Sequence, residues 1–169
     1  IFRFFFCFLP LRVGGGNSFG VVGRNTPIKG AAEFIDELKQ LGAQRVAVES
    51  CDVTQLESLR AVFDRIPEDY PLLGVMHLAG VLRDGLGVDL SPDDLHAVMA
   101  PKVDGGWNLH TLTKDVPLEF LVFFSSIAGT VGNPGQSNYG AAKAGLSGFM
   151  RTLCLEGAKY NIKVNVIAP

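Results

Sequence analysis

Ser126, Tyr139 and Lys143 are the residues whose types and spacing suit chemistry on a carbonyl group. Tyr139 and Lys143 are four residues apart on a predicted helix, so their side chains share one face. A hydride added to a carbonyl carbon leaves negative charge on the oxygen. A tyrosine hydroxyl can supply the proton when a neighbouring ammonium favours its ionised form, and Ser126 can donate a second hydrogen bond to the same oxygen. The three residues predict a carbonyl reductase, which takes its hydride from a separate donor.

The sequence around these residues supports the catalytic interpretation. A tyrosine and a lysine four apart also occur on ordinary solvent-facing helices, and an isolated match would favour that alternative. Here an apolar run ends at Ser125 and Ser126, a glycine-rich loop follows, and the helix with Tyr139 is rich in alanine and glycine. Small residues on that helix permit close approach of the backbone to another helix or to a cofactor.

Alternating strands and helices are predicted to position these side chains. The predicted strands cover residues 19–23, 45–50, 72–80, 118–126 and 162–168. The predicted helices cover residues 28–41, 54–66 with Thr54 as its cap, 92–113 with an interruption near Pro101, and 138–159. This alternation is typical of βαβ units. It predicts an α/β fold, a Rossmann-like doubly wound parallel sheet with helices on both faces, in which ligands bind beyond the carboxyl ends of the strands.

Composition restricts the class of protein further. The 169 residues carry a net charge of −2, with 47% hydrophobic and 19% charged residues. This composition lacks the excess of positive charge that binding to nucleic acid or to an anionic membrane surface requires. Three cysteines, an odd number without metal-like spacing, favour buried thiols in a reducing compartment. The three histidines have no cysteine or carboxylate partners, so no metal site is predicted. We expect a cytoplasmic protein, and an organellar location is the alternative.

Longer segments carry a family resemblance. FSSIAGTVGNPGQSNYGAAKAG resembles the active-site segment of the short-chain dehydrogenase/reductase family. GVMHLAGVLRDG, followed by MAPKVDGGWNLHTLT, is similar to ketoreductase domains of polyketide and animal-type fatty-acid synthases, and the tail KAGLSGFMRTLCLEGAKYNIKVNVIAP resembles free-standing 3-oxoacyl-(acyl carrier protein) reductases. The resemblance implies NADPH-dependent reduction of a 3-ketoacyl thioester in fatty-acid or polyketide biosynthesis. The substrate would be carried on an acyl carrier protein. The chain itself would be part of a larger multidomain synthase or would form a homo-oligomer.

The resemblance also implies roles for the catalytic residues. Ser126 would orient the carbonyl, Tyr139 would donate the proton, and Lys143 would bind the nicotinamide ribose and favour ionised Tyr139. Lys102 lies where many family members have asparagine and where synthase ketoreductases have lysine. Those ketoreductases usually carry asparagine at the position of Lys143, whereas this chain has lysine at both positions. Lys102 is therefore either catalytic or a solvated helix lysine.

Cofactor contacts are implied at the ends of several predicted strands. Ala79 and Gly80 match the position where a small residue admits the adenosine ribose, and Asp52 and Val53 match the contacts to the adenine ring. Arg24 is placed to neutralise a 2′-phosphate, which favours NADP over NAD. Asp52 could instead cap the following helix, and Arg24 could be an ordinary surface charge. The cofactor-binding candidates are Arg24, Asp52, Val53, Ala79, Gly80, Tyr139, Lys143 and Pro169.

The main departure from the family lies at the start of the chain. The family opens with a strand, a TGxxxGxG loop and a helix, whereas only VGGGNSFG precedes Gly23 and Arg24 here. The glycines at 14, 15, 16 and 20 could be a remnant of that loop, but no predicted helix follows them. We therefore expect a poorly matched segment over residues 1–18 and an incomplete ketoreductase-like domain over residues 19–169. Two alternatives stay open: a catalytically incompetent fragment or interaction remnant, and a reductase of a free ketone or alcohol.

Three further residues bear on product stereochemistry. Asp84, Pro134 and Asn138 resemble the pattern of synthase ketoreductases that give the D-3-hydroxy product. Asp84 and Asn138 could equally be turn residues, because aspartate and asparagine side chains readily bond to nearby backbone.

Overall fold

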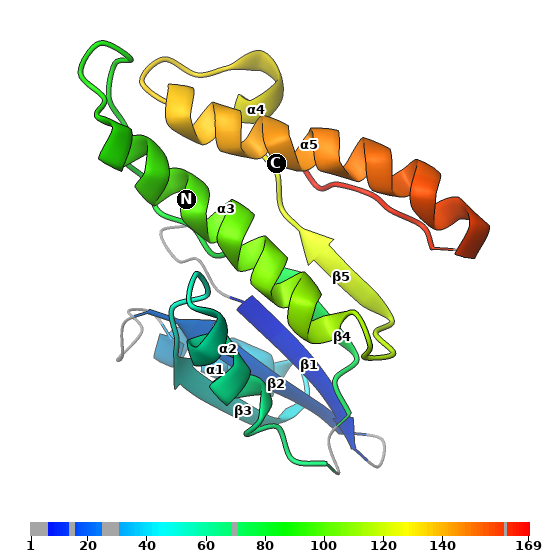
Figure 1. The fold of residues 1–169 in the computed structure, drawn as a ribbon. Coiled ribbons are helices and arrows are strands. Elements are labelled where there is room, and N and C mark those ends of the chain that lie inside the picture. The colour runs from blue at the N-terminus through cyan, green and yellow to red at the C-terminus, as the bar shows by residue number, and fades with distance from the viewer. Residues whose placement is uncertain (1–6, 14–15, 25–30, 69–70, 161) are drawn as a thin grey trace. The chain divides into compact units, whose positions relative to one another are not determined.

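The computed structural model describes residues 7–13, 16–24, 31–68, 71–160 and 162–169. Its strands are β1 (Cys7–Val13), β2 (Gly16–Gly23), β3 (Ala43–Ser50), β4 (Gly74–His77) and β5 (Phe120–Phe123). Its helices are α1 (Ala31–Gln40), α2 (Leu56–Phe63), α3 (Pro92–Thr113), α4 (Ala128–Val131) and α5 (Ser137–Gly157), followed by a 3₁₀ turn at Ala158–Tyr160 (Figure 1). Two compact units share these elements. The first unit comprises Ile1–Ala79 and Asp104–Leu121, and the second comprises Gly80–Val103 and Val122–Pro169.

The strands form one sheet in the order β3-β2-β1-β4-β5. β2 pairs with β3 in parallel, whereas β1 is antiparallel to both of its neighbours, β2 and β4. The predicted α/β fold is confirmed, but the sheet also contains β1, where no strand was predicted, and β1 makes the sheet mixed instead of wholly parallel. Only two residues separate β1 from β2, and a parallel crossover needs a dozen or more, so the two strands pair as a hairpin. Because β2, β3 and β4 run the same way, their carboxyl ends at Gly23, Ser50 and His77 lie at one edge.

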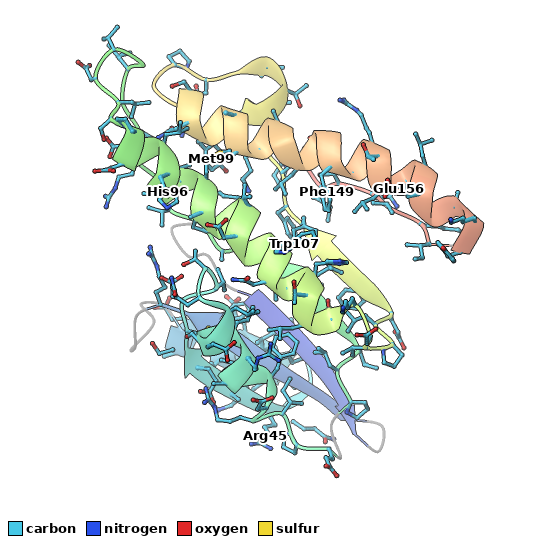
Figure 2. The ribbon with its side chains drawn as sticks, viewed as in Figure 1. Arg45, His96, Met99, Trp107, Phe149 and Glu156 are labelled. Atoms are coloured by element: carbon cyan, nitrogen blue, oxygen red, sulfur yellow. The ribbon has the colours of Figure 1, made fainter. Side chains whose placement is uncertain are left out.

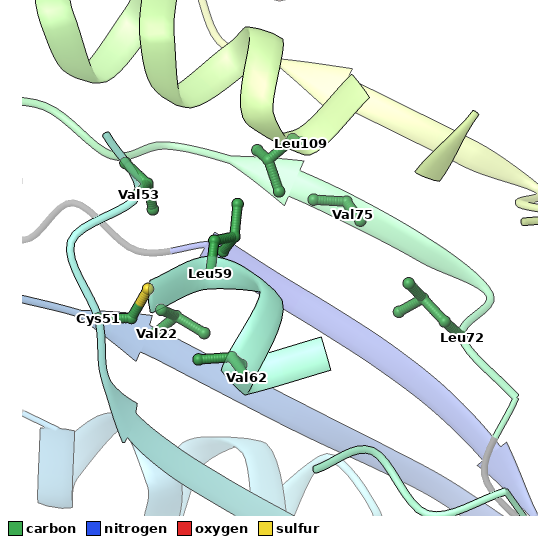
Figure 3. Packing of buried hydrophobic residues seen from close by; sticks show 8 residues of the cluster. All are labelled: Val22, Cys51, Val53, Leu59, Val62, Leu72, Val75 and Leu109. Carbon is green, nitrogen blue, oxygen red and sulfur yellow. The ribbon is translucent and has the colours of Figure 1, made fainter. Parts of the chain in front are cut away.

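Helices cover both faces of this sheet in the first unit. Val21 and Val22 of β2 are consecutive, so their side chains point to opposite faces. Val21 packs in a cluster with Leu38 of α1, whereas Val22 packs with Leu59 of α2. The second cluster is the larger of the two and is drawn in Figure 3, with Val22, Cys51, Val53, Leu59, Val62, Leu72, Val75 and Leu109. The prediction of helices on both faces therefore agrees with the packing of the first unit.

Helix α3 continues through Pro101, so the predicted interruption there is wrong. Proline lacks the N–H that would bond the carbonyl four residues earlier, which removes one bond of the helical ladder. The helix has buried residues before and after this point, Val98 and Leu109. Burial of apolar side chains can offset the lost bond.

Three other predicted local features differ, wholly or in part, in the structure. The strand expected over residues 162–168 is reduced to a single parallel bridge between Ile167 and Phe124. Thr54 does not cap α2, because its hydroxyl donates to Asp52 Oδ1 at 2.8 Å and the cap position is Gln55. The thiol prediction is confirmed for Cys51, which is buried, and is wrong for Cys154, which is exposed.

The second unit is organised by close packing of α4 on α5. A Cβ added to Gly129 would lie 2.7 Å from Ala144 N and 2.8 Å from the Lys143 carbonyl carbon, and one added to Gly140 would lie 3.1 Å from Ala128 O. Gly140, one of the small residues of this helix, thus serves helix contact. Further along α5 lies Phe149, which is labelled in Figure 2. Its ring meets the ring of Phe123 edge to face, with centroids 6.4 Å apart. None of the helices in the described ranges is long and apolar enough to cross a membrane.

Gly129→Ala should destabilise the second unit by about 1–3 kcal/mol, the usual cost of forcing a methyl group into a packed contact. The two nearest contact atoms are backbone, so they cannot move away as the end of a flexible side chain would. The matched control is Gly145→Ala on α5, where a Cβ meets nothing within 4 Å and alanine favours the helix. Urea unfolding of both variants provides the measurement. Equal midpoints for Gly129→Ala and the unaltered chain would contradict the close packing.

Candidate active site

Lys102 of α3 and Lys143 of α5 lie around the ring of Tyr139 in the second unit. Lys102 Nζ is 5.4 Å from the ring centroid and Lys143 Nζ is 5.5 Å from it. Lys102 is 3% exposed and Lys143 is 5% exposed. The alternative of a solvated helix lysine at Lys102 is therefore wrong. The structure brings together the tyrosine and both lysines that the sequence singled out.

The two buried ammonium groups are held by backbone carbonyl groups. Lys102 Nζ donates to Val81 O at 3.3 Å, and Lys143 Nζ donates to Phe124 O. No described carboxylate is within ion-pairing distance of either lysine. Burial lowers the pKa of Lys143 to about 8. Burial, together with the nearby charge of Lys143, lowers the pKa of Lys102 to about 8. Both amines therefore lose a proton far more readily than a surface lysine does.

Ser126 lies after β5, at the start of the segment that packs on α5. Its hydroxyl accepts the Ala128 N–H at 3.3 Å and donates to Pro169 O at 3.5 Å. The second distance is at the outer limit of a hydrogen bond, so a substrate oxygen can replace that partner at little cost. Pro169 O also accepts the Ile127 N–H at 2.8 Å. Pro169, a predicted cofactor contact, thus has a structural role beside Ser126.

Ser125 is a positioning residue that the sequence analysis missed. Its buried hydroxyl donates to Lys143 O at 2.7 Å and lies 3.3 Å from Ser147 Oγ. A buried hydroxyl bonded to that carbonyl fixes the turn of α5 that carries Lys143. The Ser-Ser pair at the end of a strand was the available signal, but only the structure shows which serine faces the helix.

Asn138 and Gln136 join the start of α5 to the loop after β4. Asn138 is buried, its Nδ2 donates to Arg83 O at 2.7 Å, and its Oδ1 accepts the Tyr139 N–H at 2.7 Å. Gln136 Nε2, which the sequence analysis did not single out, donates to Asp84 Oδ2 at 3.0 Å. Asn138 and Asp84 therefore have structural roles, and their part in product stereochemistry stays a prediction.

Arg24, Asp52, Val53 and Ala79 lie in the first unit, directly after the strands whose carboxyl ends form one edge of the sheet. Arg24 Nη1 is 3.9 Å from Asp52 Oδ2. Asp52 Oδ1 also accepts the Thr54 N–H at 3.0 Å, which closes a turn before α2. The cap position of α2 is Gln55, so the alternative role of Asp52 as the helix cap is wrong. Val53 is buried in the core, and its carbonyl accepts from Asn108 Nδ2 at 3.0 Å. Gly80 follows Ala79 but belongs to the second unit.

The described glycines near the start do not fit the pyrophosphate of NADP. Gly14 and Gly15 lie outside the described residues. Gly16 begins β2 opposite Val13, and Gly20 lies inside the strand. The carboxyl end of β2 is roughly 23 Å from Gly16 at 3.3 Å per residue. A dinucleotide loop needs its glycines at the carboxyl end of a strand, followed by a helix N-terminus. The described glycines therefore supply no site for the pyrophosphate, and the other predicted cofactor contacts stay predictions.

A metal centre finds no support in the described part of the chain. No group of three or more histidine, cysteine, aspartate or glutamate side chains is placed there to hold an ion.

Known proteins are similar to this chain in sequence and in fold. The model of the KR domain family matches residues 11–166. The spectinabilin polyketide synthase system protein NorB of Streptomyces orinoci is 42% identical over 135 residues, which are 79% of this chain and 6% of that protein. Mycoketide-CoA synthase of Mycobacterium tuberculosis is 45% identical over 121 residues, which are 72% of this chain and 3% of that protein. The chain thus spans a small part of these curated relatives.

Solved structures agree with this assignment. A ketoreductase domain from the bacillaene assembly line matches with a TM-score of 0.75 at 29% identity, over 88% of this chain and 36% of that one. A structure of A-type ketoreductases from a modular polyketide synthase matches with a TM-score of 0.72 at 35% identity, over 88% of this chain and 31% of that one. Sequence, fold and the Ser126, Tyr139 and Lys143 segment lead to one family: this chain belongs to the KR domains, the ketoreductases of polyketide synthases.

Proposed function

We propose that this chain reduces the 3-keto group of a ketoacyl thioester to the 3-hydroxyacyl thioester in polyketide biosynthesis, with NADPH as the cofactor. The observation that carries the proposal is the placement of Tyr139 beside two buried lysines in the unit that also holds Ser126. The names of the matched relatives favour polyketide over fatty-acid synthesis. A cytoplasmic enzyme within a larger multidomain synthase, with its substrate on an acyl carrier protein, is consistent with this assignment.

The chain's own residues supply the proton and the polar contacts. NADPH, when bound, supplies the hydride. Ser126 donates a hydrogen bond to the ketone oxygen, which orients the carbonyl and stabilises the charge that develops there. Tyr139 donates its hydroxyl proton to the same oxygen. Lys143, in its ammonium form beside the ring, stabilises the phenolate that the transfer leaves, and Ser125 and Phe124 hold that lysine through their bonds to it.

NADPH binding and ketone reduction can be measured separately on the purified chain. We expect weak binding in a fluorescence titration, because the described glycines lie away from the carboxyl edge of the sheet. We expect turnover of an acetoacetyl thioester at high NADPH concentration, and slower turnover of a simple ketone such as cyclohexanone. Absence of turnover at saturating NADPH would overturn the proposal and favour a catalytically incompetent remnant. Faster turnover of cyclohexanone would favour the free-ketone alternative.

Arg24→Ala should weaken NADPH binding about tenfold and NADH binding much less. The guanidinium follows β2 and is half exposed beside Asp52, where it can pair with a 2′-phosphate instead. Loss of one charge-assisted hydrogen bond is worth about 1.5–3 kcal/mol in a protein, and exposure brings the effect to the lower end. Arg60→Ala is the control, since Arg60 is similarly exposed and pairs with Glu57 at 3.5 Å. Equal losses of affinity for NADPH and NADH would show that Arg24 does not contact the 2′-phosphate.

A further inference from the structure

The proposed ketone reduction uses one lysine beside the tyrosine, and this chain places two lysines there. Lys102 and Lys143 are both buried and both lie within 5.5 Å of the Tyr139 ring centroid. Lys143 has the role already described, as the cation that stabilises the phenolate. Lys102 is held to the protein by a bond to Val81 O at 3.3 Å. This long bond leaves the Lys102 amine free to exchange partners.

The pair of lysines is arranged so that Lys102 loses its proton readily. Two ammonium groups near one ring repel each other, and no described carboxylate offsets their charge. Burial disfavours the charged form of both, and the charge of Lys143 adds to that effect at Lys102. A desolvated lysine beside a second cation is a known way to generate a neutral, nucleophilic amine.

We propose that Lys102 captures 3-ketoacyl compounds covalently, by forming an imine with the ketone that Ser126 and Tyr139 orient. The inference rests on the proposed function for the placement of that ketone. Tyr139 is half-buried, so the hydroxyl that contacts a ketone oxygen lies on the same ring that the amine faces. The lysine side chain has four rotatable carbon–carbon bonds, which allow Nζ to leave Val81 O and reach the carbonyl carbon.

The atoms balance without a further reactant. The lone pair of neutral Lys102 Nζ attacks the ketone carbon, the carbon–oxygen π bond breaks, and the oxygen takes a proton to give a carbinolamine. The carbon–oxygen single bond then breaks, and the oxygen leaves as water with the two hydrogens that the amine has lost. Tyr139 carries one of these protons to the departing oxygen and is restored when the nitrogen releases its proton. The products are the imine and one water molecule.

The test is reductive trapping with ethyl acetoacetate, a 3-ketoester, and sodium cyanoborohydride at pH 8, without nicotinamide cofactor. Cyanoborohydride adds hydride to the imine and leaves a stable secondary amine, which peptide mass spectrometry maps to a residue. Lys159 is the matched control, because its Nζ lies 4.8 Å over the Tyr160 ring at the surface. We expect at least about tenfold more adduct on Lys102 than on Lys159, since an ordinary lysine is almost fully protonated at this pH. Lys143→Met should reduce the labelling of Lys102.

Each result decides the inference. Labelling of Lys102 that depends on cyanoborohydride supports it. Equal labelling of Lys102 and Lys159, labelling of Lys143 in place of Lys102, or no labelling of Lys102 would overturn it. Reductase turnover is followed independently through NADPH oxidation. Turnover without labelling of Lys102 would overturn only the imine proposal. Labelling without turnover would overturn only the proposed reductase function.

Discussion

Tyr139→Phe should lower the rate of ketone reduction by about 10²- to 10⁴-fold, the usual contribution of a positioned proton donor. The substitution removes one oxygen atom and keeps the ring that both lysines face. Ser126 would still orient the carbonyl, so substrate affinity should change little and the loss should fall on kcat. Steady-state kinetics with an acetoacetyl thioester at saturating NADPH measure both parameters.

The matched control for this prediction is Tyr160→Phe. Tyr160 is 67% exposed and also lies beneath a lysine, Lys159, at 4.8 Å. It therefore reproduces the tyrosine–lysine contact outside the site, and its loss should leave kcat unchanged. Retention of activity within threefold by a folded Tyr139→Phe chain would show that the proton comes from another group. Thermal unfolding of both variants checks that the fold is kept.

Lys102→Met should make the chain more stable at pH 7 while it removes an amine from the site. Below pH 8 the folded chain must keep a buried ammonium that unfolding would return to water, so burial of Lys102 costs stability there. The pKa of Lys102 is lowered to about 8 from 10.5, which at 1.36 kcal/mol per unit is about 3 kcal/mol. The lost bond to Val81 O offsets part of this gain, and methionine fills a similar volume. We expect a net gain of about 2 kcal/mol.

The free energy of unfolding should depend on pH, because the pKa of Lys102 differs between the folded and the unfolded chain. The unfolded chain binds more protons than the folded chain between pH 8 and 10.5, so the free energy of unfolding should rise with pH across this window. In Lys102→Met the rise should be smaller, so the stability advantage of the variant at pH 7 should be lost by pH 10.5. Urea unfolding at pH 7, 9 and 10.5 measures this, with the exposed Lys159→Met as control. A variant less stable than the parent at pH 7 would show that the buried amine is not a cost.

The sequence by itself determined the features that depend on local spacing. The α/β alternation follows from apolar periodicity, which places Leu38 and Leu59 on the buried faces of short helices. The placement of Tyr139 and Lys143 on one helix face follows from their separation by a single turn. The catalytic segment and the ketoreductase family were evident in the same way, because the segment from Ser126 to Lys143 is continuous in the chain.

Only the tertiary structure decided features that depend on packing between distant segments. The sequence left Lys102 open between a catalytic and a solvated role, and its burial arises only when the turn of α3 that carries it packs near Tyr139 of α5. The role of Ser125 depends on a bond to a helix that follows it by a full loop. The direction of β1 also comes from pairing, since the hairpin with β2 sets it and places Gly16 at the edge opposite the carboxyl end of β2. Such contacts join residues that no local pattern relates, because the chain's topology decides which of them meet.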